Sequence, residues 1–143
     1  MAQGTAELVE WGVFARARAE LGGAFVRILG YFREDGTKAV GAIEHAVRER
    51  NAAGLVLPAH TLKGEARQFG AEPLALLAEQ IEMAARRCVE QRETPDELIE
   101  HIVALRPLFE STLSLFDREV SPIVDRRASF GKRPSGGFGL AQR

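Results

Sequence analysis

The sequence predicts an all-α fold: an antiparallel four-helix bundle with two additional short helices at its N-terminal end. Apolar residues recur at the i, i+3, i+4 and i+7 spacing of helix faces through most of the chain. No segment of four to eight residues alternates apolar and polar side chains as a half-buried strand does. The four longer helices are separated by short connections, which favours antiparallel neighbours.

The two short helices come first. The segment Leu8 to Glu20 carries Trp11 and Phe14 at i, i+3 spacing, and the pair Gly22-Gly23 then interrupts the pattern. A second apolar stripe follows, made of Phe25, Ile28, Leu29 and Phe32. We expect two short helices that pack on an end or a side of the bundle.

The first long helix is expected after the turn residues Asp35-Gly36. Thr37 can cap a helix that runs to about Arg50, because its hydroxyl can accept a bond from a free backbone N–H. The segment Asn51 to Gly54 ends this helix. Its predicted buried face consists of Val40, Ile43 and Val47.

The second long helix is predicted from Leu55 to Phe69. Gly70 follows at the position where helices often end in a left-handed residue. The buried stripe of this helix is expected to be Leu55, Ala59, Leu62, Ala66 and Phe69.

The third long helix should begin at Pro73 and end near Arg92. The sequence Thr94-Pro95-Asp96-Glu97 has the pattern of a capping box and predicts the start of the last helix. Pro107 should kink that helix near its middle. The inner face of the third helix is predicted as Leu74, Leu77, Ala78, Ile81, Ala85 and Cys88, and that of the last helix as Leu98, Ile102, Leu105, Phe109, Thr112 and Phe116.

These elements place one helical domain at residues 1–120. Residues 121–143 hold four glycines and five basic residues against one acidic residue, with no sustained apolar period. We expect a flexible basic and glycine-rich C-terminal tail there.

Composition limits the function classes. The chain has 143 residues, 45% hydrophobic and 27% charged, which is typical of one globular domain. Its net charge of −1 argues against nucleic acid as a partner. Cys88 has no second cysteine to pair with, and neither a secretory segment nor a membrane-spanning apolar run is seen. The sequence therefore predicts a cytoplasmic protein without a membrane partner.

His60 stands out on the second long helix. On a helical wheel, Lys63, Gly64 and Arg67 fall within about 60° of His60, whereas the apolar stripe points away. A neutral imidazole can attack phosphorus through its free lone pair, and Lys63 can balance the charge of the resulting phosphohistidine. Gly64 costs about 1 kcal/mol relative to alanine in a helix, so it predicts clearance for a partner that approaches His60.

The segment from His60 to Gly70, HTLKGEARQFG, resembles the HxLKG motif of histidine-phosphotransfer (HPt) domains. The resemblance extends over the helices from Leu8 to about Val120. It implies that His60 is the phosphoacceptor and Lys63 the charge stabiliser. It also implies that Glu82, on the following helix, accepts a hydrogen bond from Nδ1 and so presents Nε2 to the partner.

Arg86, one turn after Glu82, could contact the incoming phosphate or the acidic pocket of the partner. Together with Val56, Arg67 and Gln68, it is assigned to the partner-binding surface. Two positions depart from the family pattern: Glu65 replaces a small residue, and Pro58 lies two residues before the histidine.

The resemblance implies a carrier without autonomous catalytic activity, which exchanges phosphoryl groups with receiver domains of a hybrid histidine kinase and of response regulators. No cofactor is expected in this chain, because the receivers bring the aspartate and Mg²⁺, and a monomer is expected. An adaptor that binds or sequesters a receiver without being phosphorylated is the alternative. The dimerisation half of a histidine kinase is a third reading, although that family ends its motif in proline where this chain has Gly64.

Ordinary structural roles compete with some of these assignments. His45 and His101 lack a motif and are expected to be surface residues. Glu82 and Arg86 could form an exposed i, i+4 ion pair, and Val56 could pack at a helix end. Cys88 is expected in the core, with no metal site, because no second cysteine or paired histidine has ligand spacing.

Overall fold

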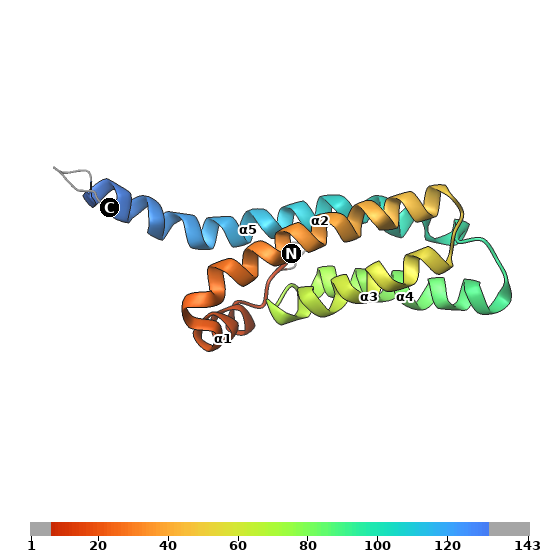
Figure 1. Cartoon of the computed structure of the whole chain (residues 1–143), viewed down its shortest axis with the longest axis horizontal. Coiled ribbons are helices and arrows are strands. Elements are labelled where there is room, and N and C mark those ends of the chain that lie inside the picture. Colours follow the sequence, from red (N-terminus) through yellow and green to blue (C-terminus); the bar gives the residue numbers. More distant parts are fainter. Residues whose placement is uncertain (1–6, 132–143) are drawn as a thin grey trace. The chain divides into compact units, whose positions relative to one another are not determined.

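The computed structural model describes the backbone of residues 7–131 and the side chains of residues 7–120, and this part of the chain is built from helices (Figure 1). No strand occurs within residues 7–131, so the all-α prediction is confirmed. The elements in order are α1 (Trp11–Leu21), the 3₁₀ turn η1 (Gly22–Ala24), α2 (Phe25–Arg48), α3 (Ala53–Gln68), α4 (Glu72–Gln91), the 3₁₀ turn η2 (Asp96–Leu98) and α5 (Ile99–Gly131).

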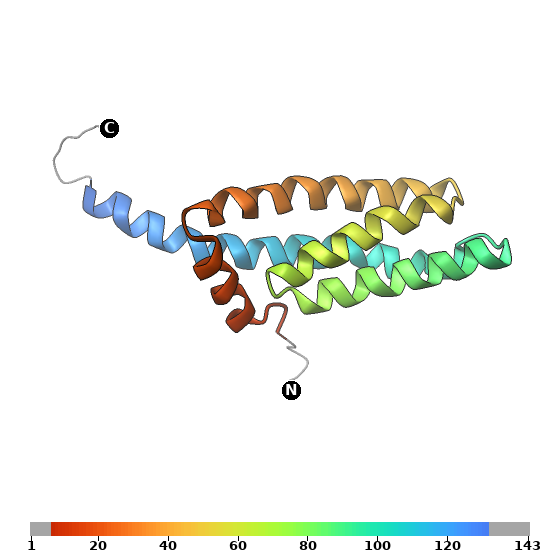
Figure 2. The same ribbon diagram turned by 60° about the horizontal axis from the view of Figure 1, so that its bottom comes forward.

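The chain divides into two compact units, Met1–Thr112 and Leu113–Arg143. The first unit contains α1 to α4 and the beginning of α5. Within it, α2, α3, α4 and the beginning of α5 lie side by side and run in alternating directions (Figures 1 and 2). The predicted antiparallel four-helix bundle is therefore confirmed. No helix within residues 7–131 is both long and apolar enough to cross a lipid bilayer.

The predicted break at Asp35-Gly36 is wrong, because α2 continues through it as one helix from Phe25 to Arg48. A Cβ atom at Gly36 would lie 2.5 Å from Cε1 of Phe109 on α5, so this glycine allows two helices to approach closely. The hydroxyl of Thr37 donates to the carbonyl of Arg33 at 2.7 Å, inside the helix, and caps nothing. The second of the two expected short helices is thus the first part of α2.

The remaining short helix, α1, packs against the end of the bundle through aromatic rings. Trp11 and Phe14 meet edge to face with ring centroids 5.1 Å apart, and Phe14 meets Phe25 in the same way at 5.3 Å. The backbone N–H of Glu10 donates to the carbonyl of Gly70 at 2.7 Å. Gly70 has a φ of 81°, and a Cβ there would lie 2.6 Å from the Glu10 carbonyl oxygen, so glycine is required.

The predicted stripe of α3 is confirmed, since Leu55, Ala59, Leu62 and Ala66 are fully buried. The helix begins at Ala53, two residues before the predicted start. Pro58 therefore lies in its second turn, where the ring removes one backbone hydrogen bond without ending the helix. The left-handed Gly70 beyond its last turn is as predicted.

The third long helix, α4, has Pro73 in its first turn and ends at Gln91, and the C-cap Arg92 that follows is left-handed at φ 57°. The predicted capping box is wrong. No side chain caps η2, and the carboxylate of Glu97 accepts a bond from Arg87 at 2.6 Å instead. Cys88 is buried, as predicted.

The last helix, α5, runs through Pro107 and continues to Gly131, beyond Val120. Arg106 on α5 donates to both carboxylate oxygens of Glu44 on α2, each at 2.9 Å, and so links the two helices. Residues 132–143 of the expected tail lie outside the described residues, and the domain boundary at residue 120 stays a prediction.

Candidate functional site

The outer face of α3 carries the side chains that the sequence singled out. The side chain of His60 is 56% exposed. Ala59 and Leu62, which are close in sequence but lie on the opposite side of the helix, are fully buried. Lys63, one turn later, is 19% exposed. The helix thus presents His60 to solvent from a rigid wall, because its opposite face is fixed in the core.

The imidazole of His60 is held by one carboxylate from the next helix. Its Nδ1 atom lies 3.0 Å from Oε2 of Glu82 on α4. The carboxylate of Glu82 is only 4% exposed. An ionised carboxylate can only accept, so the proton of the neutral ring lies on Nδ1, and Nε2 keeps a free lone pair.

Two cations also contact Glu82. The ammonium Nζ of Lys63 lies 2.9 Å from Oε1, and the guanidinium of Arg86 approaches Oε2 through Nη2 at 2.9 Å and Nε at 3.1 Å. The contact between Glu82 and Lys63 is one that the sequence did not indicate. Lys63 is paired with Glu82 across the interface between α3 and α4.

This arrangement decides the charge of Glu82. Burial by itself raises the pKa of this carboxyl group, but the bonds from Lys63, Arg86 and His60 outweigh it and lower the pKa to about 2. The carboxylate is consequently ionised at neutral pH. It can orient the imidazole and can stabilise a positive charge on that ring.

Gly64 leaves open space next to His60. A Cβ atom added at Gly64 would meet no other atom within 4 Å, so nothing in the packing of the described residues requires glycine there.

A depression of about 350 Å³ lies beside the same helix, between α2 and α3. It is lined by Leu57, Pro58 and Thr61 together with Asp35, Lys38, Ala39, Ala42 and Gly54.

Leu57 is a surface residue that the sequence analysis missed. Its side chain is 71% exposed, so it offers an apolar group to a partner. It precedes His60 by three residues and so lies on the same side of α3. That spacing is a signal in the sequence that could have identified it.

The four residues assigned to partner binding have different neighbours. Val56 and Arg86 line the same cavity of about 310 Å³ between α3 and α4. Gln68 lines a different depression, toward α1. Arg67 is paired with Glu72 at 3.3 Å and with Glu79 at 3.2 Å, so its guanidinium is held against α4.

Glu65, which departs from the family pattern, is turned toward α2. Its Oε1 atom is buried and has no hydrogen-bond partner among the described residues. Burial raises the pKa of this carboxyl group, and the negative charge of Asp35 on α2 raises it further. The ionised form of Glu65 therefore destabilises the interface between α2 and α3.

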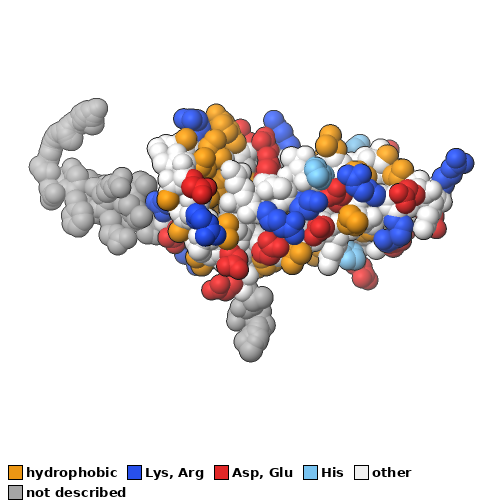
Figure 3. All heavy atoms as spheres, turned by 90° about the horizontal axis from the view of Figure 1, so that it is seen from below, with side chains coloured by type: hydrophobic (Ala, Val, Ile, Leu, Met, Phe, Trp, Pro, Cys, Tyr) orange, Lys and Arg blue, Asp and Glu red, His pale blue; other side chains and the backbone are white. Residues whose placement is uncertain are grey.

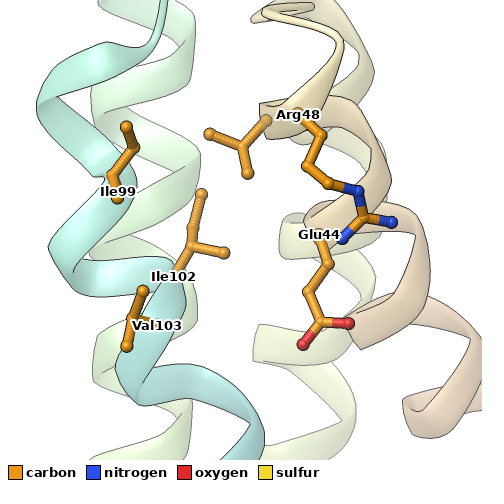
Figure 4. A pocket seen from close by; sticks show the side chains of 6 residues that line it. Glu44, Arg48, Ile99, Ile102 and Val103 are labelled. Atoms are coloured by element: carbon orange, nitrogen blue, oxygen red, sulfur yellow. The ribbon is translucent and has the colours of Figure 1, made fainter.

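One further cavity and one group of possible metal ligands lie apart from His60. A cavity of about 370 Å³ opens between α2 and α5, where Ile99, Ile102 and Val103 lie across from Glu44 and Arg48 (Figure 4). None of its lining side chains belongs to the network around Glu82. It offers mainly apolar contacts and one exposed arginine.

Sγ of Cys88 and carboxylate oxygens of Glu93 and Glu97 lie within 4.8 Å of one another. Burial raises the pKa of the Cys88 thiol, as do the charges of Glu97 and Glu93. The thiol is therefore protonated, and Glu97 is already paired with Arg87. Both facts disfavour a metal ion there, since a cysteine ligand must be deprotonated.

The face that includes α3 and α4 has a mixed charge. Histidine side chains reach the surface there among Lys, Arg, Asp and Glu side chains, with apolar groups between them (Figure 3). His45 and His101, for which no role was predicted, are both exposed, as expected. A partner for this face must therefore match both signs of charge at short range.

Comparison with known proteins agrees with the helical architecture. The family model of the Hpt domain matches residues 27–114, which is more than half of the chain. The solved structure of histidine-containing phosphotransfer protein B (HptB) from Pseudomonas aeruginosa PAO1 is similar, with a TM-score of 0.69 and 24% sequence identity. The match covers 80% of this chain and 96% of that one, and at this identity it shows the fold. Among curated proteins, no sequence matches the chain.

Proposed function

The chain belongs to the Hpt domain family, the histidine phosphotransfer proteins of phosphorelays, and we propose that its His60 accepts a phosphoryl group from one receiver domain and passes it to another. The observation that carries this proposal is the 3.0 Å contact between Nδ1 of His60 and the buried carboxylate of Glu82. It leaves Nε2 as the nucleophile on an exposed ring. A neutral imidazole in this tautomer needs no separate base to attack phosphorus.

In the proposed step, the lone pair of Nε2 forms a bond to phosphorus while the bond from phosphorus to the aspartyl oxygen of the receiver breaks. The aspartate leaves as a carboxylate with the electron pair of the broken bond. The proton on Nδ1 stays in place, so the phosphorylated ring of His60 is a cation that faces the ionised Glu82. The reverse step gives the group to the next receiver.

Two neighbours of His60 suit this chemistry. Lys63 supplies a single positive charge one turn away, which balances the phosphoryl group without a rigid bidentate grip. Gly64 leaves room for the backbone of the receiver, as its empty surroundings indicate. The apolar side chains of Val56 and Leu57 lie on the same helix and are suited to pack against that partner.

We expect the receiver domains of a hybrid histidine kinase and of response regulators as partners. The receiver provides the phosphorylated aspartate and the Mg²⁺ bound beside it, and this chain acts as the carrier between two such domains. A receiver-binding adaptor that is never phosphorylated remains the alternative. Glu65 and the basic C-terminal tail are the sequence features that favour this alternative, but Glu65 is turned toward α2 and partly buried, and so gives it little support.

The test is incubation of the chain with radiolabelled, phosphorylated receivers from the same genome, followed by chase with unlabelled receivers. Wild type should take up a label that is labile in acid and stable in alkali, and His60→Gln should take up none. His45→Gln and His101→Gln are the matched controls, since both histidines are exposed on other helices. If wild type is not labelled by any receiver but binds one, the adaptor function is correct instead.

A further inference from the structure

In the unphosphorylated protein, the cation expected to balance the phosphoryl group is already engaged. Nζ of Lys63 lies 2.9 Å from Oε1 of Glu82, and its side chain is largely buried. The phosphoryl group forms on Nε2, whereas Nδ1 of the same ring faces Glu82, so the phosphoryl oxygens lie on the side of the imidazole away from that carboxylate. To pair with them, Lys63 has to loosen its contact with Glu82.

Glu82 cannot easily lose a cation. Its carboxylate is 4% exposed, and a buried charge without a counter-ion is strongly unfavourable. If Lys63 were the only cation near Glu82, the cost of separating them would oppose transfer to His60. Another positive group must stabilise Glu82 while Lys63 moves.

Arg86 has the geometry for this task. Its Nη2 and Nε atoms approach Oε2 of Glu82, at 2.9 and 3.1 Å, whereas Lys63 contacts the other oxygen, Oε1. Arg86 is four residues after Glu82 on α4, so the pair stays together whatever α3 does.

We propose that Arg86 is a positioning residue that keeps Glu82 neutralised and thereby releases Lys63 to the phosphoryl group on His60. This inference rests on the proposed function. Before phosphorylation, Glu82 faces Lys63 and Arg86 as cations. After it, Glu82 faces Arg86 and the positively charged ring, and Lys63 pairs with the phosphoryl oxygens. The charge around the buried carboxylate is thus the same in both states.

The first experiment measures the rate of transfer from a phosphorylated receiver to Arg86→Gln, Arg86→Lys and wild type. Arg86→Gln should be slower by roughly tenfold, by analogy with the loss of a group that orients a metal-ligating histidine. Arg86→Lys should recover much of the rate, because it restores a positive charge. Arg87→Gln is the matched control: Arg87 is the next residue on α4, equally exposed and paired with Glu97, and this variant should transfer at the wild-type rate.

The second experiment follows the ¹⁵N signal of the Lys63 ammonium by NMR before and after chemical phosphorylation with phosphoramidate. The other two histidines are replaced by glutamine, so that His60 is the histidine modified. Phosphorylation of His60 should shift the Lys63 signal strongly in the protein that keeps Arg86, and less in Arg86→Gln. If Arg86 had only a structural role, the shift would be the same in both proteins.

Either of two results would overturn the inference: transfer by Arg86→Gln at the wild-type rate, or a Lys63 signal that phosphorylation leaves unchanged. The proposed function fails separately, if no receiver labels the wild type. In that case the phosphoramidate experiment still decides whether Lys63 leaves Glu82, because it needs no receiver.

Discussion

The carboxylate of Glu82 on α4 lies 3.0 Å from Nδ1 of His60 on α3, and it is nearly inaccessible to solvent while the imidazole is exposed. The buried group fixes the orientation of the exposed one. This pairing joins the core of the bundle to its reactive surface, because Glu82 is fixed on its own helix and His60 is not free to rotate. The predictions about transfer and about acid stability follow from it.

Replacement of Glu82 by glutamine should slow phosphoryl transfer about tenfold or more, by analogy with the loss of a carboxylate that orients a metal-ligating histidine. Glutamine can still accept a bond from Nδ1, but it cannot stabilise the positive ring that transfer creates. It also leaves Lys63 and Arg86 without their anion. Rapid-quench measurement of label on His60 tests this. Equal rates for Glu82→Gln and wild type would show that the carboxylate charge is unimportant.

The same carboxylate should make the fold sensitive to acid. The pKa of Glu82 is about 2 in the folded chain and about 4.5 in an ordinary setting, so its stabilising contribution is complete above pH 4.5. It is lost as the pH falls from 4.5 through 2, and a shift of this size corresponds to roughly 3 kcal/mol. Urea unfolding of wild type and Glu82→Gln should show a stability difference that shrinks over this range. A difference independent of pH would contradict the assignment.

Glu65 should behave in the opposite way. Burial and the neighbouring Asp35 raise its folded pKa, so ionised Glu65 destabilises the fold at pH 7. Glu65→Gln should therefore be more stable than wild type at neutral pH, because the amide carries no charge to be desolvated or to be repelled by Asp35. The gain should disappear below the ordinary pKa of glutamate, where the carboxyl group is protonated in both states. Urea unfolding at pH 7 and at pH 4 distinguishes this from a general packing effect, which would persist at both.

Gly36 should tolerate no side chain. In Gly36→Ala the new Cβ would lie 2.5 Å from the ring of Phe109, and such overpacking typically costs 1–3 kcal/mol, or about 2 kcal/mol here. Gly41→Ala is the control on the same helix, because a Cβ there meets no atom within 4 Å. It should stabilise the chain by up to about 1 kcal/mol through helix propensity. Opposite signs in the two unfolding free energies are the expected result.

The wrong prediction of a turn at Gly36 shows what the sequence alone could not distinguish. Most buried positions were predicted correctly, because the buried residues of α3 and α4 repeat with the period of a helix, although Val47 and Leu77 are only half-buried and the buried Ala75 was not predicted. A glycine that opens a turn and a glycine that admits a ring from another helix look alike in one sequence, and only packing separates them. The capping box at Thr94 failed for a related reason, since Glu97 had a stronger partner in Arg87 on α4.

The site was predicted in part. The exposure of His60 followed from its place on the helix wheel, whereas the role of Glu82 came from the family resemblance. The contact between Lys63 and Glu82 could not be predicted, because it depends on how α3 and α4 pack and on which charges that packing leaves buried. The pairing of Arg67 with Glu72 and Glu79, and the place of Gln68 in a depression toward α1, have the same origin.

Gly64→Ala should separate stability from function. Alanine stabilises a helix interior by about 1 kcal/mol relative to glycine, and an added Cβ meets nothing within 4 Å, so the variant should unfold at higher urea concentration than wild type. If the space beside His60 is needed by the incoming receiver, the same variant should accept label from that receiver more slowly, and Gly64→Leu more slowly still. Phosphoramidate is small enough to reach His60 in all three proteins, and it should modify them at similar rates. A Gly64→Leu variant that reacts with the receiver as fast as wild type would remove the steric reason for glycine at this position.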